Sequence, residues 1–91
     1  MTYALDYTAD ALESLALFKK SNPVAHKKVM QLIGELHEHP RTGTGKPKQL
    51  SGNLAGCYAR KITDKHRLVY EIYDDVVRVL VLSVAGHYND K

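Results

Sequence analysis

The order of apolar and polar residues over the first forty positions predicts one short strand followed by two helices. Apolar side chains alternate with their neighbours over residues 3–7, the two-residue period of a half-buried strand. From Ala9 to Lys20 the apolar period becomes helical, with Thr8 as N-cap. Asn22-Pro23 supplies a second cap and a proline at the first helical position, and this second helix ends before Pro40. Its apolar stripe consists of Ala25, Val29, Leu32, Ile33 and Leu36.

The rest of the chain predicts a loop and three strands. Residues 41–53 have neither a helical nor a strand period and are rich in glycine. Strand-like runs follow over residues 56–62, 66–73 and 76–85, and Asp74-Asp75 forms a tight hairpin turn between the last two. We therefore expect an α+β fold, in which a two-helix hairpin packs on one face of a small antiparallel sheet and leaves the other face open.

Length and composition indicate one small globular domain over residues 1–91. Of the 91 residues, 44% are apolar and 25% charged, and a chain of this size would gain useful burial from a homodimer interface. A single cysteine, Cys57, excludes an intramolecular disulfide and suggests a reducing compartment. The N-terminus lacks the basic start of a secretory signal, and no apolar run approaches the roughly 20 residues of a membrane span. We expect a soluble cytoplasmic protein that does not bind membranes.

Positive charge is concentrated in the middle of the chain. The whole protein carries a formal charge of only +3, but residues 41–67 contain seven Lys or Arg and a single acid, Asp64. A polyanion such as RNA is the natural partner of such a segment. Lys46, Arg60 and Lys65 are candidate RNA-binding residues within it.

The residue types available for chemistry favour phosphodiester cleavage without a metal ion. Nucleotide-cofactor, serine-hydrolase and metalloprotease motifs are absent, so we expect no cofactor. His37 and His39 are two apart on the predicted helix and do not share a face, so a metal site there is not expected. Lys or Arg can stabilise the extra negative charge on phosphorus while a histidine transfers a proton.

Four segments resemble the YoeB/Txe toxins of the RelE superfamily. They are Gly43-Thr-Gly-Lys-Pro-Lys-Gln-Leu50, Asn53-Leu-Ala-Gly56, Arg60-Lys-Ile-Thr-Asp-Lys-His-Arg-Leu-Val-Tyr70 and His87-Tyr88. The resemblance implies a microbial-ribonuclease-like fold and cleavage of mRNA in the ribosomal A site. It also implies a cognate antitoxin of the Phd/YefM type, through which alone the toxin would contact operator DNA.

The resemblance also implies roles for individual residues. Arg67 matches the active-site arginine that stabilises the pentacoordinate phosphorane. Lys61 takes the place of a second arginine, which keeps the charge but loses the bidentate fork. His87 matches the general acid that protonates the departing 5′ oxygen, and Tyr88 matches a tyrosine that orients or stacks on the substrate. Lys48 stands where the family usually has a glutamate, the proposed general base.

This departure leaves the general base unassigned and keeps other functions open. The base would be neutral Lys48, Glu71, or a group of the RNA or solvent. A non-catalytic RelE-fold inhibitor that blocks the A site, or a ribonuclease that cuts free RNA, would fit the same residues. In a purely structural interpretation, Arg67 is a solvated cross-strand partner of Glu71 or of another acid nearby. His66 is expected on the opposite sheet face from Arg67, and three tyrosines are expected to pack in the sheet: Tyr58, Tyr70 and Tyr73.

Overall fold

The computed structural model describes residues 2–87, with the side chains of residues 2–84. The elements are β1 (Ala4–Tyr7), α1 (Ala9–Ser21), α2 (Pro23–Leu36), β2 (Lys48–Gln49), β3 (Cys57–Lys61), β4 (His66–Tyr73) and β5 (Arg78–His87). Short 3-10 helices lie at Gly52–Leu54 and Asp74–Val76. Within the described residues, neither α-helix is long and apolar enough to cross a membrane.

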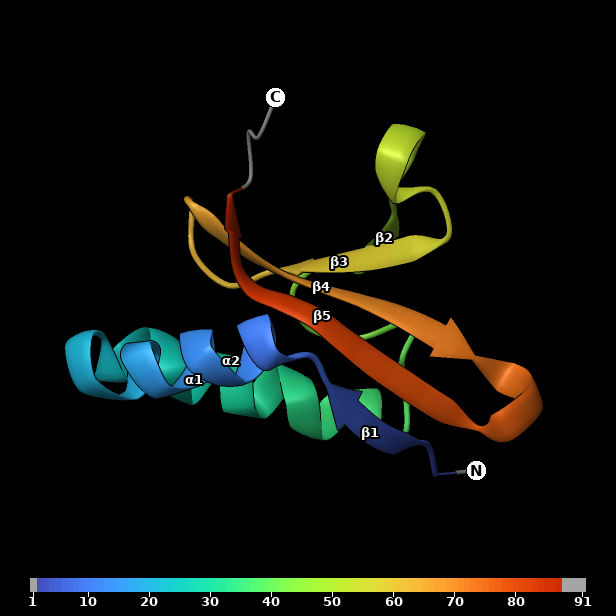
Figure 1. Ribbon diagram of the computed structural model, residues 1–91, viewed down its shortest axis with the longest axis horizontal. Coiled ribbons are helices and arrows are strands. Elements are labelled where there is room, and N and C mark those ends of the chain that lie inside the picture. Colours follow the sequence, from blue (N-terminus) through green and yellow to red (C-terminus); the bar gives the residue numbers. More distant parts are fainter. Residues whose placement is uncertain (1, 88–91) are drawn as a thin grey trace.

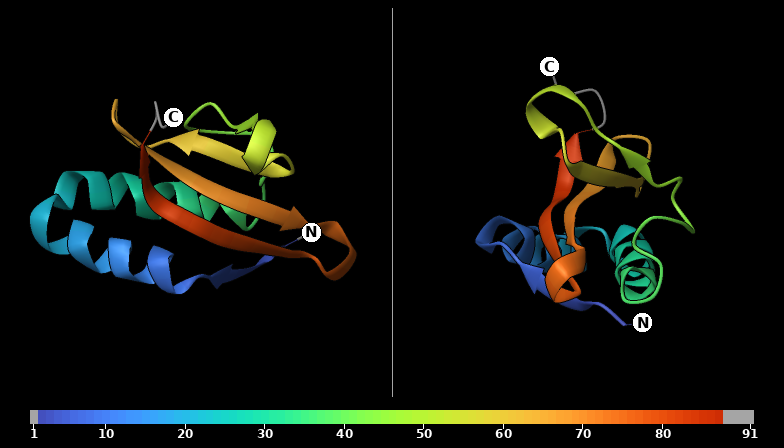
Figure 2. Two further views of the ribbon diagram at one scale, coloured as in Figure 1. Left: turned by 45° about the horizontal axis from the view of Figure 1, so that its top comes forward. Right: turned by 90° about the vertical axis from the view of Figure 1, so that its right-hand side faces the viewer.

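The strands form one five-stranded sheet in the order β1-β5-β4-β3-β2 (Figure 1). The neighbouring pairs from β5 to β2 are antiparallel, whereas β1 runs parallel to β5. Both helices cover the same face of the sheet, and the segment of β2 and the first 3-10 helix lies on the opposite side (Figure 2). The predicted α+β architecture is therefore confirmed, with a sheet that is mostly rather than wholly antiparallel.

Side-chain caps define the helical hairpin. Thr8 Oγ1 accepts a hydrogen bond from the Ala11 amide at 3.1 Å and donates one to the Leu82 carbonyl at 2.8 Å, which ties the start of α1 to β5. Asn22 caps both helices. Its backbone N–H donates to the Phe18 carbonyl at the end of α1, and its side-chain Oδ1 accepts from the Ala25 amide at the start of α2. α2 ends at Leu36, earlier than the predicted limit before Pro40, and the turn that follows is held to Tyr3, the residue before β1.

The main core lies between the helices and the sheet. Every residue of the apolar stripe predicted for α2 is buried there. The sheet contributes fully buried side chains from β4 and β5, namely Leu68, Tyr70, Val79, Val81 and Val84. Burial of each such side chain contributes about 1.5–3 kcal/mol, so this layer supplies most of the driving force for folding.

The other sheet face is partly covered, which corrects the expectation of an open face. Cys57, Ala59 and Val69 form a second, smaller cluster under Leu50 and Leu54. Leu50 belongs to the segment predicted as an irregular loop and Leu54 follows that segment directly; in the structure this stretch contains β2 and a 3-10 helix. The sequence did not predict β2, because the segment is rich in glycine and the strand has only two residues. Its pairing with β3 depends on tertiary contacts.

The connection between β4 and β5 also differs from the prediction. A tight two-residue turn was expected at Asp74-Asp75, but a 3-10 turn followed by left-handed Val77 (φ 53°) joins the strands. Asp74 there accepts hydrogen bonds from Arg41 and Tyr3, both at 2.7 Å. These bonds lower the pKa of the Asp74 carboxyl, with the Arg41 contact as the largest cause. The longer connection thus anchors two distant segments of the chain, those of Tyr3 and Arg41.

Candidate active site

Two cations face each other at the end of the β3–β4 ladder. Lys61 pairs directly with Arg67, and the preceding pair on the same face is Ala59 with Val69. Both cations therefore lie on the sheet face turned away from the helices, because alternate residues of a strand share a face. Like charges directly opposite one another destabilise a sheet. This juxtaposition of two cations favours a site for an anion.

Arg67 has an unsatisfied hydrogen-bond donor. Its Nε is buried and has no hydrogen-bond partner among the described residues. Leaving a buried donor unpaired costs about 1–3 kcal/mol, and more when the group is charged. An anionic oxygen bound at this position would remove that cost and would also relieve the repulsion from Lys61.

Lys61 forms an ion pair that is easily displaced. Its Nζ lies 3.1 Å from Asp64, whose side chain is 95% exposed. An ion pair between such hydrated groups contributes about 0–1 kcal/mol and weakens with salt. Asp64 therefore competes only weakly with a phosphate for Lys61.

The structure brings Lys48 to the same face. In the β2–β3 register Lys48 is opposite Ala59, which lies two residues before Lys61 on β3. Two residues along a strand span about 7 Å, so Lys48 borders the Lys61–Arg67 pair. Its side chain is exposed. Three of the predicted site residues are thus neighbours on one face of the sheet, although their chemical roles stay predictions.

The remaining predicted site residues lie at the end of β5. The β4–β5 register places Gly86 opposite Arg67 and His87 opposite His66. The backbone of His87 is therefore next to the cation pair, while Tyr88 lies outside the described residues. The register shifts twice between Arg67 and Tyr70, and such irregularities bend a strand. The end of β5 curves accordingly (Figure 1).

Arg60 is not available to bind RNA, which corrects its assignment as an RNA-binding residue. Its side chain is 0% exposed and its guanidinium donates to the carbonyls of Thr42 at 2.7 Å and of Thr44 at 3.2 Å, and to that of His39. It also donates to Glu35 Oε1 at 2.8 Å and to Tyr70 Oη at 3.1 Å. Arg60 therefore holds the loop that leads to Lys48.

Glu35 completes this anchor. Its Oε1 accepts from the Thr44 amide at 2.8 Å as well as from Arg60. Hydrogen bonding from Thr44 and, to a smaller extent, from Arg60 lowers the pKa of the Glu35 carboxyl. A Cβ on Gly43, whose φ is +118°, would collide with this carboxylate. The loop therefore needs glycine at this position for both conformation and space.

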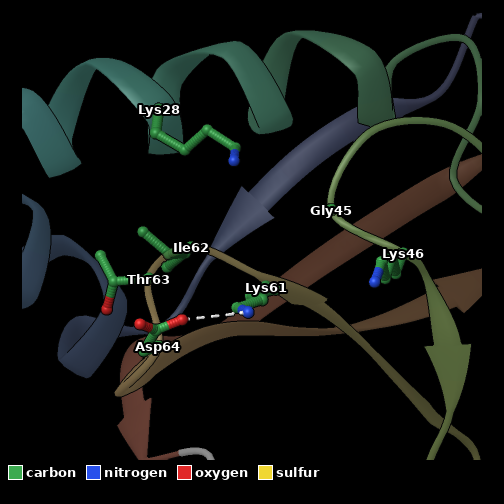
Figure 3. Close-up of a pocket in the computed structure, with 7 residues that line it drawn as sticks. All are labelled: Lys28, Gly45, Lys46, Lys61, Ile62, Thr63 and Asp64. Atoms are coloured by element: carbon green, nitrogen blue, oxygen red, sulfur yellow. Dashed lines mark ion pairs between the residues drawn. The ribbon is translucent and has the colours of Figure 1, made fainter.

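Lys46 and Lys65 are both at the surface, as a role in binding RNA requires. Lys65 is exposed in the turn between β3 and β4. Lys46 lines a pocket of about 540 Å³ together with Lys61 and residues of that turn (Figure 3). Lys28 of α2 lines the same pocket, a position that the sequence pattern did not reveal. No three His, Cys, Asp or Glu residues gather as a metal site within the described part of the chain.

The positions of Glu71 and His66 in β4 bear on the roles considered for them in the sequence analysis. Glu71 is four residues from Arg67 along β4, about 13 Å, and accepts a hydrogen bond from Tyr73 Oη at 2.7 Å. Glu71 and Arg67 belong to the same strand, so Glu71 is not a cross-strand partner of Arg67, and it lies away from the Lys61–Arg67 pair. The His66 ring packs edge-on against Phe18, which confirms that it lies on the helix side.

The tyrosines expected to pack in the sheet do so to different degrees. Tyr70 is fully buried and stacks with Tyr58, and its hydroxyl donates to the Pro40 carbonyl at 2.6 Å. Tyr73 is 42% exposed, and its hydroxyl donates a hydrogen bond to Glu71. Arg41 lies over the Tyr58 ring, 5.8 Å from its centroid, a contact that the sequence pattern did not predict.

A family model matches residues 7–88 and is described as a YoeB-like toxin of a bacterial type II toxin-antitoxin system. Among named relatives, Toxin RelK from Mycobacterium tuberculosis is 36% identical over 85 residues, covering 93% of this chain and 98% of RelK. Toxin YoeB from Escherichia coli is 42% identical over 62 residues, which are 68% of this chain and 71% of that protein.

Solved structures show the same fold. The YoeB/ParE toxin from Agrobacterium tumefaciens superimposes with a TM-score of 0.87 at 29% identity, covering 93% of this chain and 99% of that one. The YoeB dimer from Staphylococcus aureus superimposes with a TM-score of 0.82 at 29% identity, covering 97% and 100%. The heterotetrameric YoeB-YefM complex from the same organism gives a TM-score of 0.80, also at 29% identity and with the same coverage.

Proposed function

This chain belongs to the YoeB toxin family of bacterial type II toxin-antitoxin systems, and on that premise we propose that it is an mRNA endoribonuclease acting in the ribosomal A site. The observation that carries this proposal is the unpaired, buried Nε of Arg67, which has no partner among the described residues and lies on the residue directly opposite Lys61. The Lys61–Arg67 pair is best suited to a phosphodiester that is being converted to a phosphorane, because negative charge grows on its non-bridging oxygens.

The reaction is an internal transfer. The 2′ oxygen attacks the adjacent phosphorus, and the bond from phosphorus to the 5′ oxygen breaks. The products are a 2′,3′-cyclic phosphate and a 5′-hydroxyl end. Arg67 and Lys61 stabilise the phosphorane, His87 gives its proton to the departing 5′ oxygen, and Tyr88 orients or stacks on the substrate. Lys46 and Lys65 bind the RNA backbone, and a group must accept the 2′ proton.

Lys48 serves this reaction as an electrostatic clamp. It borders the cation pair, and a phosphodiester favours the charged form of a neighbouring lysine. Because Glu71 lies about 13 Å along β4 from Arg67, we assign the 2′ proton to a group of the RNA or to solvent. We expect Lys48→Arg to retain most of the single-turnover cleavage rate, and Lys48→Glu to be tolerated. A wild-type rate that climbs with pH, together with an inactive arginine variant, would show instead that neutral Lys48 is the base.

The partners follow from the same premise. The toxin is held inactive by a cognate antitoxin of the Phd/YefM type, in the way that the Staphylococcus aureus YoeB toxin forms a complex with YefM, and it contacts operator DNA only through that antitoxin. Free toxin forms a homodimer, as its Staphylococcus aureus relative does. We expect it in the cytoplasm, where ribosomes translate mRNA.

Primer extension on mRNA tests cleavage against the second candidate function. A toxin that only blocks the A site would arrest growth without producing cut ends, and the lysine at position 48 in place of an acid is what favours that alternative. We expect induction without antitoxin to create new 5′ ends within translated codons. Translation arrest with intact mRNA would refute the nuclease, and cleavage of purified RNA at the same rate without ribosomes would refute ribosome dependence.

His87→Ala is expected to relieve growth arrest. The substitution removes the proton donor but no side chain of the described core, so the circular dichroism spectrum and the urea midpoint should stay unchanged. Colony counts after induction, with protein levels matched by immunoblot, provide the measurement. A folded variant that remains as toxic as the wild type would remove His87 from the mechanism.

A further inference from the structure

The pocket lined by Lys46 and Lys61 reaches beyond the cation pair to α2. It lies between Lys28 of α2, the loop at Gly45-Lys46, and the start of the β3–β4 turn (Figure 3). Lys28 lies on the side of its helix that faces Ile62 and the Gly45 loop, whereas its neighbour Lys27 is exposed and does not line the pocket. Lysine side chains from three separate elements thus surround one opening.

Among the described residues that line the pocket, Asp64 alone carries a carboxylate. It pairs with Lys61, and its 95% exposure keeps it hydrated. Within the described residues, neither Lys28 nor Lys46 has a carboxylate at ion-pair distance. The pocket therefore has an uncompensated positive charge that an anion would neutralise.

The backbone at Lys46, beside the pocket, is strained, and the surrounding contacts hold it in that conformation. Lys46 has a φ of +51° and precedes Pro47, two conditions that oppose each other for a residue with a Cβ. Such a conformation costs about 1–3 kcal/mol and persists only where the surroundings impose it. Here a Cβ on Gly45 would lie 3.1 Å from the Lys61 carbonyl, and the Gly45 carbonyl accepts a hydrogen bond from the Lys61 amide at 2.7 Å. The loop is therefore held against β3 with Lys46 at the pocket.

We propose that this pocket binds the mRNA phosphate next to the scissile phosphate, with Lys28 as a binding residue. The inference rests on the proposed function and extends it to a second subsite. Lys61 belongs to both the cation pair and the pocket, so the two sites are adjacent, and consecutive phosphates are the anions that a nucleic acid offers at adjacent positions. Lys28 and Lys46 clamp the flanking phosphate, while Arg67 faces the reacting one.

A binding experiment tests the subsite without any cleavage. The probe is an all-2′-deoxy trinucleotide, which has no attacking hydroxyl and cannot be cut. In amide NMR titrations we expect shifts at Gly45, Lys46 and Thr63 that saturate in the wild type, weaken several-fold in Lys28→Gln and persist in the matched control Lys27→Gln. Equal titration curves for Lys28→Gln and the wild type would overturn the proposal even if the protein cuts mRNA.

Cleavage on the ribosome identifies which phosphate is bound. A neutral methylphosphonate next to the scissile phosphate should raise the half-saturating toxin concentration for the wild type, with little change in the maximal single-turnover rate. It should have no further effect on Lys28→Gln, because the contact is already gone. If the methylphosphonate raised the half-saturating concentration of Lys28→Gln by as large a factor as that of the wild type, Lys28 would be assigned to an rRNA contact instead. Absence of wild-type cleavage would refute the proposed function, whereas the trinucleotide titration would still decide the subsite.

Discussion

Arg67→Ala is expected to slow cleavage of ribosome-bound mRNA by about 10²-fold or more, the usual effect of removing a preorganised group that faces transition-state charge. Single-turnover rates at saturating ribosome concentration isolate the chemical step from binding. Arg67→Lys should recover only part of the rate, since an ammonium cannot replace the planar fork of donors. Arg78→Ala, which removes an arginine paired with Asp6 near the other end of β5, should cleave at the wild-type rate.

Stability gives a second measurement on the same position. Because Arg67 opposes Lys61 and carries an unpaired Nε among the described residues, Arg67→Met should leave the free energy of unfolding unchanged or raise it, while slowing cleavage as much as Arg67→Ala does. A loss of several kcal/mol in this variant would mean that Arg67 is a structural residue. A loss confined to ribosome affinity in Arg67→Ala would remove its role in the chemical step.

Arg60→Met is expected to lower the free energy of unfolding by about 3–5 kcal/mol, because it leaves a partly buried carboxylate and several loop carbonyls without their donor. The affected groups are Glu35 Oε1 and the carbonyls of His39, Thr42 and Thr44. Urea unfolding followed by circular dichroism measures the loss. Lys61→Met, at the next position of β3 and 39% exposed, is the matched control and should cost less than about 1 kcal/mol.

The outcome separates a structural anchor from an RNA contact. If Arg60 bound RNA, Arg60→Met would fold as stably as the wild type and lose affinity for the ribosome. A change in the free energy of unfolding no larger than that of Lys61→Met would contradict the anchor. Since the loop held by Arg60 continues into Lys46 and Lys48, we expect that any folded fraction of the variant also cleaves more slowly.

Local patterns of the sequence determined most of the secondary structure, and they supplied the candidate residues of the site. The caps at Thr8 and Asn22, the buried stripe of α2 and the three long strands were predicted because each is encoded within a few residues. The two-residue strand period also indicated that Arg60 is buried, because it places Arg60 on the same face as Tyr58 and Ile62. Its charge alone suggested a surface position, and that interpretation was wrong.

Only the tertiary structure decided how these pieces meet. The parallel pairing of β1 with β5, the short β2 and the register shifts in β4–β5 depend on contacts between segments far apart in the sequence, which no local period encodes. The same is true of Lys48, Lys61 and Arg67, which became neighbours through the registers of two strand pairs, and of Lys28, which a helix on the other side of the pocket contributes. A sequence pattern states which face a side chain occupies within its own element, whereas a binding site depends on which elements are adjacent and at what register.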